Sequence, residues 1–164
     1  MFDLKSSKGK LNICIVFFIV MSLCITGYIF YNSLQKPETS NKKSDAISNK
    51  IQSLVDPENK ISAANFKKYT RKAAHVIEFG SLGLSLGAIF LCVYKKDKRL
   101  FISLPLFLSL SVAVTDEFIQ SFNKRSSLLK DVLIDFAGAL GGLVIILLLA
   151  MLFGKKKFKK TDKF

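Results

Sequence analysis

Apolar residues are gathered into four long runs, which charged residues separate. The first run has no charged residue between Lys10 and Lys36, and residues 11–31 are long enough, at about 1.5 Å per residue, to cross a bilayer core of about 30 Å. A secretory signal peptide would instead have an apolar core of about 7–15 residues that ends in small residues. Because this run is longer and ends in Phe30 and Tyr31, we predict a retained transmembrane helix.

The three later runs are too short to cross a membrane without including charged residues. Only 16 uncharged residues follow Glu78, and only 16 precede Asp116, and a helix of that length covers about 24 Å. The last run has 19 uncharged residues, 136–154. The second span must therefore include Glu78, the third must include Asp116, and Asp135 lies at the margin of the fourth. Pro105 is predicted to kink the third span.

Basic residues flank these runs unevenly, which predicts the orientation. Of the 25 Lys and Arg residues, 13 lie in the segment before residue 11, the 95–100 connection and the tail after Gly154. Short cytoplasmic segments are enriched in Lys and Arg. We therefore expect an all-α protein of the plasma membrane with four transmembrane helices in a small bundle and both termini in the cytoplasm.

This topology divides the chain into five parts. They are a basic cytoplasmic amino end at 1–10, the first transmembrane helix at 11–31, an extracytoplasmic loop at 32–71, a core of three transmembrane helices at 72–154 and a Lys-rich cytoplasmic tail at 155–164. Within the loop, four apolar residues follow the spacing of an amphipathic helix: Ile47, Ile51, Leu54 and Val55. This segment is expected either to lie on the outer membrane surface or to be a linker. The tail is expected to bind anionic lipids.

Polar residues of the last three spans are predicted to meet at one end of the bundle. Successive spans alternate in direction, so these residues reach the same, outer leaflet, and helical periodicity places them on converging faces. Ionisable groups inside a span usually face the bundle interior. We expect an outward-facing pocket lined by Arg71, His75, Glu78, Asp116, Gln120, Arg125, Asp131 and Asp135. The alternative is a set of salt bridges and hydrogen bonds that only holds three helices in register.

Glycines and cysteines in the spans are assigned to packing. Gly83 and Gly87, and likewise Gly138 and Gly142, have the small-xxx-small spacing that brings transmembrane helices together. The three cysteines, Cys14, Cys24 and Cys92, lie in apolar runs without the spacing of metal ligands.

The polar residues resemble two sequence blocks of the VanZ-like membrane protein family. The first is Arg71, Lys72, His75, Glu78, Phe79, Leu82 and Gly83, similar to the family's R-K-x-x-H-x-x-E-Y/F pattern. The second is Asp116, Glu117, Gln120, Phe122, Arg125, Asp131, Val132, Leu133, Ile134, Asp135, Gly138 and Gly142, similar to the family's D-E-x-x-Q stretch, its loop Arg and the D-V-L-I-N/D-x-x-G-x-x-x-G entry into the last helix. The loop before Arg125 lacks the family's usual Pro-Gly. The family's namesake confers low-level resistance to the glycopeptide teicoplanin, so the resemblance implies a role at the cell envelope.

Three functions remain open at this point. In the first, the pocket binds a membrane lipid headgroup or a lipid-linked cell-wall precursor and lowers the access of a glycopeptide. In the second, the protein is a membrane enzyme whose catalytic candidates are His75, Glu78 and Asp116, either with His75 as general base or with all three holding a divalent cation, Mg or Ca rather than zinc. The third is a proton-coupled transporter. No Ser or Cys nucleophile accompanies His75, which favours a protein that is not an enzyme.

No cofactor is expected apart from such a cation. The net charge of +13 would suit a nucleic-acid-binding protein only if the basic residues covered a soluble surface. Here they lie between apolar runs, so nucleic acid is not expected as a partner.

Overall fold

The computed structural model confirms an all-helical fold. It describes residues 2–35, 37–58, 60–97, 102–122 and 129–158, and within these ranges it contains five α-helices and no strand. The helices are α1 (Phe2–Leu34), α2 (Pro37–Val55), α3 (Ala63–Asp97), α4 (Ser103–Phe122) and α5 (Leu129–Phe158).

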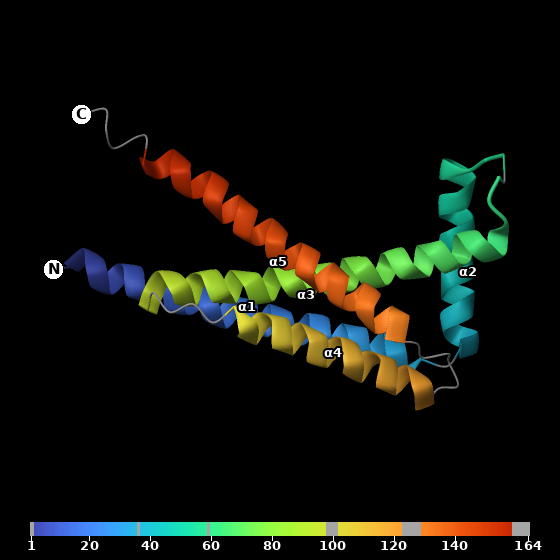
Figure 1. The fold of residues 1–164 in the computed structure, drawn as a ribbon, viewed down its shortest axis with the longest axis horizontal. Coiled ribbons are helices and arrows are strands. Elements are labelled where there is room, and N and C mark those ends of the chain that lie inside the picture. Colours follow the sequence, from blue (N-terminus) through green and yellow to red (C-terminus); the bar gives the residue numbers. More distant parts are fainter. Residues whose placement is uncertain (1, 36, 59, 98–101, 123–128, 159–164) are drawn as a thin grey trace.

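Four helices lie roughly along a common axis, and α2 lies crosswise to them (Figure 1). Helices α1 and α4 run one way and α3 and α5 the other, so the beginning of α1 and the end of α5 lie at the same end of the molecule. Helix α3 is central because it contacts each of the other four helices. Helix α2 lies at the opposite end, beside the first turns of α3 (Figure 1).

Three of the described helices are long and apolar enough to cross a membrane: Gly9–Leu34, Ala63–Lys96 and Leu129–Phe153. Many of their large apolar side chains are exposed, for example Phe17 on α1 and Leu148 on α5, as expected of surfaces that face lipid. The described part of the structure therefore shows three helices that could span a membrane, one fewer than the four spans predicted from the sequence. Helix α4 has the predicted position, but its 20 residues include Asp116, Glu117 and Gln120, and it is not among these three.

Pro105 does not kink a helix interior, contrary to the sequence prediction. It is the third residue of α4, and in the first helical turn its missing N–H has no helical partner to lose. The uncharged run before Asp116 sets only an outer limit for the start of this helix.

Glycines let α3 and α5 pack backbone against backbone. A Cβ atom on Gly83 would overlap the carbonyl group of Ala139, and one on Gly142 would overlap the carbonyl oxygen of Gly80. Side chains at these positions would push the helices apart, so only glycine permits this approach. We call this line of contact the glycine seam.

Helix α2 packs on the protein through polar side chains and exposes its apolar side chains. Ser48 is 2% exposed, and the buried Gln52 donates a hydrogen bond of 2.8 Å from Nε2 to the carbonyl oxygen of Ile61. On the same side, Lys67 of α3 forms an ion pair with Asp45. The residues of the predicted apolar face all point away from the protein: Ile47, Ile51, Leu54 and Val55.

The substitution Gly142→Ala is expected to lower the free energy of unfolding by about 1–3 kcal/mol, because its methyl group would overlap the backbone of α3. The neighbouring Gly141 has nothing within 4 Å of the position of a Cβ, so Gly141→Ala is the matched control and is expected to be neutral. Unfolding in mixed micelles with increasing dodecyl sulfate, followed by circular dichroism, measures both. Equal stability of the two variants would contradict the glycine seam.

Candidate functional site

Polar side chains from four helices meet at the end of the bundle that lies near α2. The last turn of α1, the second half of α4 and the first turns of α5 all reach this end, beside the middle of α3 (Figure 1). Five of the residues predicted for the pocket come together here, and we call them the polar cluster: His75, Glu78, Asp116, Gln120 and Asp135.

Asp116 is the most enclosed member of the polar cluster. It is 0% exposed, and its two carboxylate oxygens accept hydrogen bonds from different directions. Ser33 of α1 donates to Oδ1 through its hydroxyl group, and Gln120, one turn further along α4, donates to Oδ2 from Nε2 at 2.9 Å. These two donors fix the orientation of a carboxylate that water does not reach.

His75 and Asp135 lie against Asp116. The Nδ1 atom of His75 is 3.4 Å from Oδ1 of Asp135 and 3.9 Å from Oδ2 of Asp116. Asp135 is 1% exposed, whereas the side chain of His75 is 25% exposed. Among the described residues, neither Nδ1 of His75 nor Oδ2 of Asp135 has a hydrogen-bond partner. The cluster is thus closed around its acids and accessible along the histidine.

The remaining predicted site residues lie around this group. Glu78 accepts a hydrogen bond of 3.1 Å from Asn32 Nδ2 on α1. Lys72 and Asp131 form a partly exposed ion pair, with 3.4 Å between Nζ and Oδ1. Arg71 is also partly exposed, and none of the ion pairs among the described residues includes it. Arg125 lies outside the described residues.

The structure also suggests a different set of metal ligands from the one proposed from sequence. One donor atom from each of His75, Asp116 and Asp135 lies within 4.8 Å of the others. We call these three residues the triad. Asp135 takes the place that the sequence analysis gave to Glu78, because Asp135 faces His75 across the glycine seam.

Sequence reasoning missed the contribution of α1. Asn32 and Ser33 are hydrogen-bond donors to Glu78 and Asp116, yet the sequence analysis ended the first span at residue 31 and gave both residues to the loop. The available signal was that both are polar and lie at the end of a long apolar run, with Ser33 one turn after the buried Ile29.

The burial of its two carboxylates determines which chemistry the triad can support. Two carboxylates enclosed by apolar helices are costly unless a positive charge or protons neutralise them. In this part of the chain the nearest group that can carry positive charge is the imidazole of His75. The arrangement can therefore bind a cation or exchange protons.

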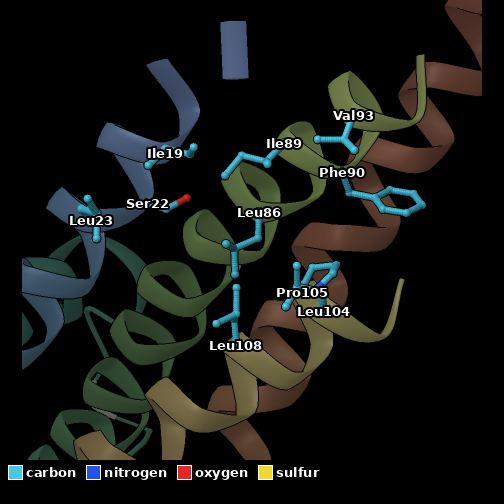
Figure 2. A pocket seen from close by; sticks show the side chains of 10 residues that line it. All are labelled: Ile19, Ser22, Leu23, Leu86, Ile89, Phe90, Val93, Leu104, Pro105 and Leu108. Carbon is cyan, nitrogen blue, oxygen red and sulfur yellow. The ribbon is translucent and has the colours of Figure 1, made fainter. Parts of the chain in front are cut away.

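An apolar cavity lies nearer the other end of the bundle. It measures about 310 Å³ and lies between α1, α3 and α4 (Figure 2). Its lining residues are Ile19, Ser22, Leu23, Leu86, Ile89, Phe90, Val93, Leu104, Pro105 and Leu108. The hydroxyl group of Ser22, the only polar side chain among them, is hydrogen-bonded to that of Ser85 at 2.8 Å. Such a cavity suits an alkyl chain and offers no polar recognition.

Comparison with known proteins identifies one relationship. A protein-family model described as VanZ/LLP1 matches residues 18–152, a region that contains the whole polar cluster. No curated protein and no solved structure matches the chain.

The substitution Ser33→Ala is expected to lower the free energy of unfolding by about 1–3 kcal/mol, since it leaves a buried carboxylate oxygen of Asp116 without its donor. The control is Ser81→Ala, because the exposed hydroxyl group of Ser81 donates only to the carbonyl oxygen of Ile77 on its own helix. The same dodecyl sulfate titration compares the two variants. If Ser33→Ala were as stable as Ser81→Ala, Ser33 would not be holding Asp116.

Proposed function

Because this chain belongs to the VanZ/LLP1 family, we propose that it is a cell-envelope protein whose polar cluster binds the headgroup of a lipid or of a lipid-linked wall component. This binding would lower the access of glycopeptides such as teicoplanin to their target. The observation that carries the proposal is the convergence of polar side chains from four helices on buried Asp116 and Asp135, with one edge left accessible at His75.

We place α4 in the membrane as a fourth span. If α3 and α5 both cross the membrane, the chain must cross back between them, and α4 runs from the end of α3 towards the beginning of α5 (Figure 1). Its 20 residues cover about 30 Å as a helix. Its two acidic residues, Asp116 and Glu117, and Gln120 are buried in the protein rather than exposed.

We propose the orientation from the basic residues at one end of the bundle. Lys95 and Lys96 lie in the last turn of α3, at the same end as the beginning of α1 and the end of α5 (Figure 1). An end so rich in Lys is expected to be cytoplasmic. The polar cluster then lies on the outer side of the plasma membrane, where wall components are found.

The surroundings of the polar cluster favour a phosphate-bearing headgroup. Arg71 and Lys72 precede His75 on α3, and both are partly exposed. Arg71 makes no ion pair within the described part of the chain, so its guanidinium group is available for bidentate contact with phosphate. Phosphate is shared by membrane lipids and lipid-linked wall precursors, and the exposed apolar flanks of the bundle suit their chains.

Helix α2 is assigned to the membrane surface on the same side. It lies crosswise to the spans (Figure 1), its polar side chains contact the protein, and its exposed apolar face has no partner among the described residues. An amphipathic helix in this orientation buries its apolar face at the lipid headgroup boundary. Lys42 and Lys50 of α2 are exposed and would contact anionic headgroups.

The chain has no Trp, so a single introduced Trp reports the position of α2. In vesicles that contain brominated lipids, the fluorescence of an Ile51→Trp variant is expected to be strongly quenched, because Ile51 lies on the apolar face. The control is Asn49→Trp, which lies on the exposed polar side of the same helix and is expected to be quenched weakly. Equal weak quenching of both variants would place α2 away from the lipid.

Deletion of the gene is expected to lower the minimum inhibitory concentration of teicoplanin, and the wild-type gene is expected to restore it. Complementation with Arg71→Gln or His75→Gln is expected to fail, because each removes a group that would contact the headgroup. Lys68→Gln removes an exposed charge from the same helix and is expected to complement. Immunoblots of membranes check that all variants are present. Unchanged susceptibility after deletion, or full complementation by both site variants, would refute the proposed function.

A further inference from the structure

The distances within the triad are close to those between ligands that share one metal ion. Two ligand atoms at about 2.2 Å from an ion, seen at about 90–120°, are about 3.1–3.8 Å apart. In the structure, Nδ1 of His75 is 3.4 Å from Oδ1 of Asp135 and 3.9 Å from Oδ2 of Asp116. The three ligand atoms come from three helices and lie within 4.8 Å of one another, so small side-chain movements suffice to coordinate an ion.

The triad also contains a buried carboxylate oxygen that lacks a partner. Asp135 is 1% exposed, and its Oδ2 atom accepts no hydrogen bond from any described residue. Nδ1 of His75 lies at ion-pair distance from both acids but meets the criteria of a hydrogen bond with neither. A cluster that only joined the helices would be expected to satisfy Oδ2 of Asp135. Nearby Lys72 does not supply the missing charge, because it forms an ion pair with Asp131.

Hydrogen bonds from neighbouring residues orient a carboxylate of the triad, as they do in metal sites. The carboxylate of Asp116 is oriented by Ser33 and Gln120, and hydrogen bonds of this kind usually fix the carboxylates that bind metals. Each carboxylate oxygen has a further lone pair for an ion. The partly exposed ring of His75 provides an entry path.

From these observations we propose that His75, Asp116 and Asp135 bind a divalent cation of the Mg²⁺ and Mn²⁺ class. The donors are one imidazole nitrogen and carboxylate oxygens, which favour hard cations, and no thiolate is among them. Cys14 and Cys92 contact each other at the other end of the molecule, with 3.1 Å between their Sγ atoms. Three protein ligands leave further positions of the ion open to water or to an anionic oxygen. The cation would bind without lipid, so this proposal does not depend on the proposed function.

Mn²⁺ is the probe for this site, because its paramagnetic resonance signal reports both affinity and ligand type. The full-length protein, purified in detergent and stripped with a chelator, is titrated with Mn²⁺. The wild-type protein is expected to bind one Mn²⁺ ion and to show the coupling of a directly bound ¹⁴N nucleus. His75→Gln is expected to lose that coupling, and Asp135→Asn to weaken binding about tenfold or more.

The matched control is Glu117→Gln, which removes a buried carboxylate from the residue next to Asp116 but outside the triad. It is expected to keep both the affinity and the ¹⁴N coupling. Gel filtration and circular dichroism without metal establish which variants are folded. If Asp135→Asn is not folded, the test rests on the His75→Gln variant, whose substituted side chain is partly exposed.

The proposal fails if the wild-type protein does not bind Mn²⁺, so that the resonance signal remains that of the free ion. It also fails if the bound ion shows no nitrogen coupling, or if the His75→Gln variant retains the nitrogen coupling. Such a result leaves the teicoplanin phenotype untouched. Conversely, Mn²⁺ binding in a protein whose deletion does not change susceptibility would refute only the proposed function.

Discussion

A carboxylate enclosed between apolar helices must be hydrogen-bonded and neutralised, and this requirement governs the arrangement of the molecule. Asp116 and Asp135 are 0% and 1% exposed, so water cannot stabilise their carboxylates. Each of the four long helices therefore directs polar atoms to the same end. Helix α1 supplies Ser33, α3 supplies His75, and α4 supplies Gln120. The rest of the bundle is free to be apolar.

Much of this could be predicted from the sequence because run length and helical period are local properties. The lengths of the uncharged runs required Glu78 and Asp116 to lie within helical spans, and the 100° repeat placed Asp116 and Gln120 on one face. The structure bears out this face, since both residues are buried and hydrogen-bonded to each other. The start of α4 was harder to predict, because charge positions set only an outer limit and Pro105 is compatible with a first turn.

Contacts between helices could not be predicted in the same way. The pairing of Ser33 with Asp116 depends on the rotation of α1 about its own axis, and the apolar sequence of α1 has no strong face that would set it. The choice between Glu78 and Asp135 as the partner of His75 likewise depends on how α3 and α5 approach each other. That α2 contacts the protein through its polar face was not predicted, because the four apolar residues gave the stronger periodic signal in the sequence.

The glycine seam has a consequence for the chemistry at the end of the bundle. A Cβ atom on Gly138 would lie 2.9 Å from the carbonyl oxygen of Val76, and these two residues adjoin the turns that carry Asp135 and His75. Backbone contact therefore acts as a spacer of fixed length between the carboxylate and the imidazole. If the proposed cation binds there, residues with no polar side chain would define the size of the ion that fits, and a small change in helix separation would alter selectivity without changing any of the three proposed ligands.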